Sequence, residues 1–319
     1  MAPGPAPTFD PDDIPYFFDT WCSLAWTPWV PFTAGKYEFR IIPKEPGLYR
    51  IRPVGKDFLM YIGETGRPLH RRLNDLRMEL RNRDLMPWSE PHIEAPGLWA
   101  WSDWSESQED ERDPQDPPVI MAGRYEYECS AAPLDASQSG RHGMEAFLLY
   151  RYRQERGRST ICNFGRFHPR YRKSTGRKEG MRGGRLAGGQ RDNPAGWPGT
   201  EPLEVTAKPG DRNWMGLEWT AREPLAAENV RKIAAGAGLY LLSDTVSQEV
   251  VHIGQSADVA GRLLDLSRES CKGKTLEFSY QIIGQSVLPH HLKELENDLI
   301  GNYYENFRKA PEFQFRNSR

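Results

Sequence analysis

Two tyrosines, an arginine-rich segment, a glutamate and an asparagine are the side chains of this sequence whose types and order could serve one reaction. In chain order they are Tyr49, Tyr61, Arg71 or Arg72, Glu145 and Asn163. A tyrosine can exchange a proton, a carboxylate can hold a hard cation, and a guanidinium can stabilise an anion. Each residue alone is explained as well by cross-strand aromatic packing or by a solvated helix surface. Only the whole set indicates a site.

Short apolar segments surround the two tyrosines and must position them. Residues 47–53 and 58–63 have the composition of two antiparallel strands joined around 54–57. Leucines at 69, 73, 76 and 80 then recur at helical spacing and predict an amphipathic helix with arginines on its other faces. Alternating residues before Glu145 predict a third strand, and Glu145 itself lies in a second helix. The expected order is strand, strand, helix, strand, helix.

The same pattern recurs near the end of the chain. The matched distances are 12 residues for Tyr49 to Tyr61 and for Tyr240 to His252, and 18 residues for Glu145 to Asn163 and for Glu296 to Gln314. Duplicated units keep such distances where the backbone geometry is constrained. The first copy has 40 more residues between its second tyrosine and its glutamate, which predicts an insertion at about 82–122. We therefore expect two α+β units, each a small antiparallel three-stranded sheet flanked by helices.

In this order the residues resemble the GIY-YIG endonuclease family. The matching elements are Gly47-Leu48-Tyr49, Tyr61-Ile62-Gly63, an arginine in the next helix, Glu145 and Asn163. The resemblance covers about 41–171 and, in a degenerate form, 235–319. With it, the chain divides into an aromatic, proline-rich extension (1–40), a first domain (41–171), a basic glycine-rich arm and linker (172–234) and a second domain (235–319).

The resemblance implies a metal-dependent endonuclease that hydrolyses phosphodiester bonds. Glu145 would hold Mg²⁺, with Mn²⁺ as an alternative ion, Tyr49 would act as the base, and Tyr61 would orient the water. Asn163 would support the loop beside them. For the arginine that contacts the scissile phosphate, the distance from the second tyrosine slightly favours Arg71. The local match of Arg262-Leu263 to Arg72-Leu73 favours Arg72 instead.

The second copy retains most of the set, and its corresponding residues are Tyr240, His252, Arg262, Glu296 and Gln314. Where the family has tyrosine and asparagine, this copy has histidine and glutamine. Histidine can act as a base near neutral pH, so the change does not forbid catalysis. The preferred hypothesis is an intramolecular pseudo-dimer in which the second copy packs against the first or binds DNA without cutting it. Association with further chains is left open.

Charge is unevenly distributed along the chain. The formal net charge of -2 gives no bulk attraction to nucleic acid, so local clusters must provide it. The basic stretch between Gly165 and Arg191 is interspersed with glycines and suits an arm that follows phosphates, or else a solvated linker. Its expected DNA-binding residues are Arg166, Arg170, Arg172, Lys173, Arg177 and Lys178. The acidic insertion is unsuited to phosphate and is a lid, a partner surface or a structural excursion.

Several other classes of protein are disfavoured. No run of about 18 apolar residues exists, and the first residues lack the pattern of a signal peptide. The four cysteines are too dispersed for a zinc site or a disulfide scaffold. We expect a soluble cytoplasmic protein with four buried thiols, and an aromatic N-terminal segment that packs on the core.

The sequence therefore predicts an endonuclease that uses Mg²⁺ to cut duplex DNA, by analogy in a restriction or defence setting. Two alternatives share part of this argument. One is a non-catalytic DNA-binding or repair-accessory module, because a fold alone does not establish activity. The other is a structure-selective or single-strand nuclease, which has the same chemistry and a different substrate.

Overall fold

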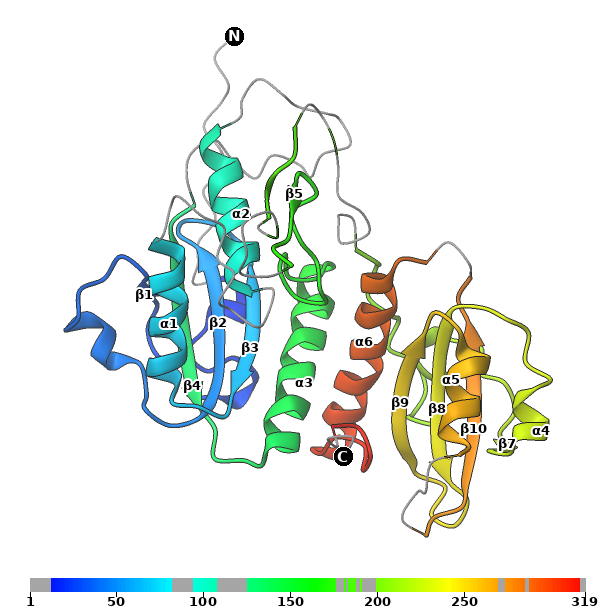
Figure 1. Cartoon of the computed structure of the whole chain (residues 1–319). Coiled ribbons are helices and arrows are strands. Elements are labelled where there is room, and N and C mark those ends of the chain that lie inside the picture. Colours follow the sequence, from blue (N-terminus) through cyan, green and yellow to red (C-terminus); the bar gives the residue numbers. More distant parts are fainter. Residues whose placement is uncertain are drawn as a thin grey trace. The chain divides into compact units, whose positions relative to one another are not determined.

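The computed structural model describes residues 13–81, 94–107, 125–175, 181, 183–187, 190, 199–268, 273–284 and 287–315 (Figure 1). The chain forms two compact units. The first comprises Met1–Asp135, Thr160–Asn163 and Lys173–Arg185, and the second comprises Ala136–Ser159, Phe164–Arg172 and Leu186–Arg319. The units differ from the boundaries predicted from the sequence, because the helix that carries Glu145 falls in the second unit.

The first unit is built on an antiparallel sheet with the strand order β1-β4-β2-β3. The strands are β1 (Val30–Pro31), β2 (Gly47–Pro53), β3 (Tyr61–Thr65) and β4 (Tyr127–Pro133). In its described part, the unit also contains the helices α1 (Leu69–Arg81) and α2 (Glu94–Ser107) and the two-residue strand β6 (Gly184–Arg185). Its short 3₁₀ turns are η2 (Pro15–Phe17), η3 (Trp21–Ser23) and η4 (Glu38–Ile41). The predicted sheet had three strands, and the difference is the short edge strand β1. Helix α2 lies in the predicted insertion and was not foreseen.

The hairpin and α1 follow directly from the sequence pattern. Every residue of β2 is buried, and a side chain at Gly47 would overlap the backbone carbonyl of Ala132 on β4, so glycine is required there. Leu69, Leu73 and Leu76 of α1 are fully buried. This helix therefore packs its apolar face on the sheet, as the leucine spacing predicts.

The second unit has a sheet of the same order, β7-β10-β8-β9. Its strands are β7 (Glu223–Pro224), β8 (Gly238–Asp244), β9 (Val250–Ser256) and β10 (Leu276–Ile282), and its further short elements are β5 (Tyr171–Arg172) and η5 (Trp214–Gly216). The helices are α3 (Gln138–Arg156), α4 (Ala227–Val230), α5 (Val259–Leu266) and α6 (Pro289–Phe307). Helix α5 lies over the sheet, and α6 packs along β9 (Figure 1). The α+β class with antiparallel sheets is confirmed.

The repeat begins earlier than the hairpins. Trp26 donates through Nε1 to the carbonyl of Trp21 at 3.0 Å, and Trp219 donates to the carbonyl of Trp214 at 3.1 Å. The residue after each first tryptophan has a positive φ, 55° in η3 and 57° in η5. The string Trp-x-x-Leu-x-Trp-Thr occurs at 21–27 and at 214–220. These strings open the two copies, so the predicted N-terminal extension and linker each contain part of the repeat.

The N-terminal aromatic segment packs on the first sheet, as expected. Trp21, Trp26 and Phe32 are buried. The guanidinium of Arg50 on β2 lies 4.3 Å from the ring centroid of Trp26 and donates to the carbonyl of Tyr16 at 2.6 Å. Burial lowers the pKa of Arg50 well below its ordinary value. Cation–π contacts and backbone acceptors compensate this buried charge, and the segment is thereby attached to the sheet.

Helices α3 and α6 pack against each other in an antiparallel pair within the second unit. Ser137 caps α3 by accepting from the Gly140 amide, and Gly157 ends it with a φ of 73°. At one end of the pair the rings of Phe147 and Tyr304 lie 5.7 Å apart. The helices approach closely because Gly301 leaves space for Tyr150.

The other end of the helix pair is held by a buried ionic network. Arg153 donates through Nε and Nη2 to both oxygens of Asp298, at 2.7 and 3.0 Å, and lies 3.7 Å from Glu294. It also donates to the carbonyl of Glu201 at 3.1 Å, and the three ionic side chains are fully buried. Burial raises the pKa of Asp298, while the ion pair with Arg153 opposes that rise. The network fixes α3, α6 and the segment near 200 in one register.

The structure bears on two expectations from the composition, which concern membrane-spanning helices and the cysteines. Among the described residues no helix has the length and apolar character needed to cross a membrane. Cys129 and Cys162 are buried thiols, Cys22 is partly buried, and Cys271 lies outside the described residues.

Replacing Arg153 by alanine should destabilise the protein by about 3–5 kcal/mol, because it leaves Asp298 and Glu294 buried without their guanidinium. The matched control is the exposed Arg158, where the change to alanine should cost less than about 0.5 kcal/mol. Urea unfolding of both variants measures the difference. Equal stability of the two variants would contradict a stabilising role for the network.

Candidate functional site

The two motif tyrosines lie together on the hairpin. Tyr49 is fully buried, Tyr61 is partly exposed, and their rings are stacked with centroids 6.1 Å apart. Gly63 stands opposite Tyr49 in the β2–β3 register, and a Cβ at Gly63 would come within 2.7 Å of the Tyr49 hydroxyl. The glycine of the second tripeptide is thus required by the position of the first tyrosine.

The arginine beside this pair is Arg72. Its Nε donates to the hydroxyl of Tyr49 at 3.2 Å, and the side chain is buried. Arg71, which the distance along the sequence slightly favoured, is exposed. The reason is helical periodicity, because Arg72 stands three residues after Leu69 and four before Leu76, on the buried face of α1. The leucine spacing in the sequence could therefore have decided between Arg71 and Arg72.

Asn163 binds the backbone of the second tripeptide. Its Oδ1 accepts from the Ile62 amide at 3.0 Å, and its Nδ2 donates to the Ile62 carbonyl at 2.8 Å. Thr160 donates through Oγ1 to the same Oδ1 at 2.6 Å. Strand β3 is at the edge of its sheet, so Asn163 satisfies backbone groups that have no neighbouring strand. The first unit therefore brings Tyr49, Tyr61, Arg72 and Asn163 together.

The second unit repeats this arrangement with different side chains. Gln314 accepts from the Ile253 amide at 2.9 Å and donates to the Ile253 carbonyl at 2.8 Å, as Asn163 does at Ile62. Tyr240 is buried, and its hydroxyl lies 3.4 Å from Nε2 of His252. A Cβ at Gly254 would overlap the Tyr240 ring. The longer glutamine thus preserves the contact that asparagine makes in the first copy.

Charge differs between the two copies. Burial, and then the nearby positive charge of Arg262, lower the pKa of His252 to about 4. At neutral pH this imidazole is uncharged and can accept a hydrogen bond from Tyr240. Arg262 is exposed, whereas Arg72 is buried against its tyrosine. The second copy therefore has a weak base and a more solvated arginine.

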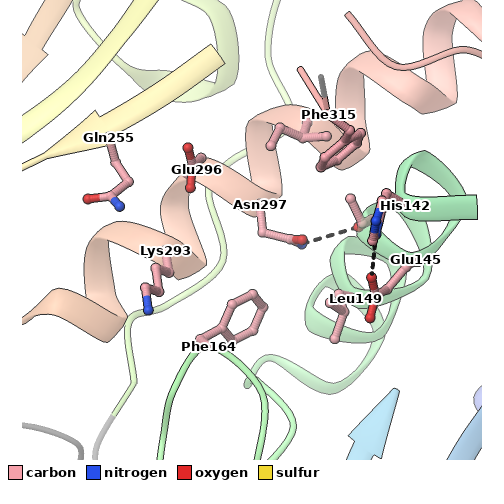
Figure 2. A pocket seen from close by; sticks show the side chains of 11 residues that line it. His142, Glu145, Leu149, Phe164, Gln255, Lys293, Glu296, Asn297 and Phe315 are labelled. Atoms are coloured by element: carbon pink, nitrogen blue, oxygen red, sulfur yellow. Dashed lines mark hydrogen bonds and ion pairs between the residues drawn. The ribbon is translucent and has the colours of Figure 1, made fainter. Parts of the chain in front are cut away.

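The two glutamates line one pocket of the second unit, between α3 and α6 (Figure 2). The pocket has a volume of about 280 Å³, and its lining residues are His142, Glu145, Ala146, Leu149, Phe164, Gln255, Lys293, Glu296, Asn297, Ile300 and Phe315. Glu145 pairs with His142 of the preceding helical turn, Oε2 to Nδ1, at 3.5 Å. Asn297 donates to the carbonyl of Ala146 at 3.2 Å.

Glu296 supplies the carboxyl group on the α6 side of this pocket. Burial raises its pKa to about 7, against the opposing effects of Lys293 and of a hydrogen bond from the Gln255 backbone. Both the protonated and the ionised form of this carboxyl group are therefore accessible near neutral pH. The sequence motif indicates both glutamates, but it does not indicate that they share a pocket, nor that Phe164, Phe315 and Gln255 belong to it.

Oxygen atoms dominate the polar groups that could hold a cation. Two carboxylates and the side-chain amides of Gln255 and Asn297 line the pocket, and no thiol does. Hard cations such as Mg²⁺ prefer these donors. Among the residues described here, no cluster of three or more His, Cys, Asp or Glu side chains is arranged to hold a metal. A Mg²⁺ ion bound through one carboxylate and water does not require such a cluster.

The predicted DNA-binding arm needs correction at two positions. Arg166 and Arg170 are buried, and Arg166 lies 3.5 Å from the buried carboxylate of Glu294. They belong to the interior of the second unit. This could not be predicted from local sequence, because Glu294 lies 128 residues after Arg166. Arg172 is exposed and Lys173 is partly exposed. Arg177 and Lys178 lie outside the described residues.

No protein-family model, curated protein or solved structure matches the chain.

Replacing Asn163 by alanine should make the Ile62 amide exchange with deuterium roughly 5- to 150-fold faster, because a buried backbone group loses its partner, at a cost of about 1–3 kcal/mol. The change Gln314→Ala should do the same at Ile253. Site-resolved hydrogen exchange measures both amides. Each variant is the control for the other, and faster exchange at both amides in either variant would show general unfolding instead.

Proposed function

We propose that the chain is a Mg²⁺-dependent endonuclease that hydrolyses phosphodiester bonds of duplex DNA, acting in restriction or defence. The observation that carries this proposal is the duplicated frame of a buried tyrosine, a glycine opposite it and a side-chain amide that binds the second tripeptide. An ordinary aromatic cross-strand pair does not require this combination. The order of the residues and their resemblance to GIY-YIG nucleases supply the reaction class.

The residues have distinct parts in the proposed hydrolysis. Arg72 donates to the oxygen of Tyr49, and a guanidinium at that distance can stabilise negative charge that develops on this oxygen during the reaction. Tyr49 can then accept a proton from water, while Tyr61 beside it orients that water. A guanidinium has five N–H donors, so Arg72 can also stabilise the charge on the phosphate oxygens.

Glu145 supplies the carboxylate for the cation. Bound Mg²⁺ would polarise the phosphate and stabilise the leaving oxygen. Glu145 lines a pocket rich in oxygen donors, which suits that ion. The function proposed here requires Glu145 to act with the tyrosines of the first copy, as its position in the sequence motif implies.

The second copy is proposed to support the first without cutting. His252 has a pKa of about 4 and is a weak base at neutral pH. Arg262 is exposed rather than buried against Tyr240. The weak base would remove a proton from water less readily, and the exposed arginine would be held less firmly for stabilising the charge on the phosphate.

The change Glu145→Gln should lower the rate of Mg²⁺-dependent DNA cleavage by at least about 100-fold, because it removes the charge that holds the cation. The matched variant is Glu296→Gln in the second copy, which should retain most of the activity. Cleavage of supercoiled plasmid, linear duplex and single-stranded DNA by folded protein measures both.

The same cleavage assays also distinguish the proposed function from its alternatives. Cleavage unaffected by Glu145→Gln would contradict the proposed site, and equal loss in both variants would contradict a single active copy. Binding of DNA without cleavage by the wild type would favour an accessory module. Cleavage of single-stranded DNA alone would show that the substrate is single-stranded, while the proposed hydrolysis reaction would still hold.

Replacement of Arg72 by lysine should reduce kcat by roughly 100- to 1,000-fold, because an ammonium group cannot reproduce the donor geometry of the guanidinium. Arg71→Lys is the matched control, and it should remain within a few-fold of the wild type because Arg71 is exposed. Steady-state cleavage rates, with circular dichroism to verify folding, measure the pair. A larger loss for Arg71→Lys would reverse the assignment.

A further inference from the structure

The pocket between α3 and α6 is built from equivalent positions of the two copies. Five pairs of lining residues are separated by 151 positions in the sequence: His142 and Lys293, Glu145 and Glu296, Ala146 and Asn297, Leu149 and Ile300, and Phe164 and Phe315. Of the lining residues that the structure describes, Gln255 is the one without such a counterpart. The walls are therefore the same face of two related helices, with different side chains on each side.

The protein's own charged groups in this pocket disfavour an anionic occupant when no cation is bound. Glu145 and Glu296 supply carboxyl groups, while Lys293 supplies an ammonium group and His142 pairs with Glu145. Since Glu296 has a pKa of about 7, it can both donate and accept a hydrogen bond at neutral pH. With no cation bound, the carboxyl groups would repel a phosphate here, whereas a neutral group with donors and acceptors would not be repelled.

Aromatic rings and amides supply the other contacts. Phe164 and Phe315 are both partly exposed, and the ring of Phe315 lies 5.3 Å from that of His142 (Figure 2). Asn297 and Gln255 contribute side-chain amides, which can read the polar edge of a planar ring. A volume of about 280 Å³ is at the low end for small-molecule pockets, so it suits one ring system.

The backbone at Phe164 is unusual for a phenylalanine. Its φ is 60°, and the following Gly165 also has a positive φ of 77°. A bulky residue in this region is strained and persists only where other interactions require it. The conformation places an aromatic side chain in the lining of the pocket.

We propose that this pocket binds one unstacked nucleobase, with Phe164 and Phe315 contacting its faces and Glu296, Asn297 and Gln255 its polar edge. The inference rests on the proposed function, because a DNA substrate supplies the base. A neutral, flat ring with donors and acceptors satisfies the charge, the aromatic lining and the size of the pocket together. Stacking on aromatic side chains compensates for the stacking that the base loses in DNA.

Photo-crosslinking tests the proposal directly. Full-length protein is mixed with a duplex in which 5-iodouracil replaces every thymine of one strand, in Ca²⁺ to suppress cleavage, and irradiated. A second arm uses free 5-iodouridine, which separates a base carried by DNA from a free nucleoside. Mass spectrometry should map the cross-links to peptides containing Phe164 or Phe315. Either Phe→Leu change should lower their yield about tenfold.

The control is Phe307→Leu, which removes an exposed ring of α6 outside the pocket and should leave the yield unchanged. Cross-links at the pocket in either arm support a nucleobase site. If the protein still binds and cuts DNA but the cross-links are confined to other peptides, the proposed nucleobase site would be wrong and the proposed function would stand. If the wild type binds neither DNA nor nucleoside, both the proposed nucleobase site and the proposed function would be wrong.

Discussion

Hydrogen bonding at the edge of each sheet is the constraint on which the candidate site depends. Strands β3 and β9 are edge strands, so the outward backbone groups of Ile62 and Ile253 need partners that no strand provides. One side-chain amide satisfies both groups in each case, from Asn163 in the first copy and from Gln314 in the second. Each amide follows a long helix in the sequence. The contact therefore fixes the end of the repeat to the tyrosine-bearing hairpin.

Glycine then determines where the tyrosines can lie. Gly63 and Gly254 face Tyr49 and Tyr240 across the hairpins, and a side chain at either glycine would collide with the ring opposite. The short tripeptides are meaningful for this physical reason. The same frame carries two sets of side chains, since Tyr61 and a buried Arg72 in one copy are replaced by His252 and an exposed Arg262 in the other.

Much of this frame could be predicted from the sequence, because it depends on local periodicity. The hairpin near 47–65 and the start of α1 at Leu69 were predicted closely. Helix α2 and the buried state of Arg166 were not, since tertiary contacts decide them. The Trp-x-x-Leu-x-Trp-Thr strings were visible in the sequence and would have shown that the repeat starts near residue 21. The shared pocket of Glu145 and Glu296 depends on helix packing that periodicity does not specify.

If the first copy of this frame belongs to a cation-dependent nuclease, the purified wild-type chain should cut supercoiled plasmid in Mg²⁺ and leave it intact in EDTA. Incubation under both conditions should therefore give nicked or linear plasmid in Mg²⁺ and supercoiled plasmid in EDTA. An intact plasmid in Mg²⁺, or equal cutting in EDTA, would contradict this assignment.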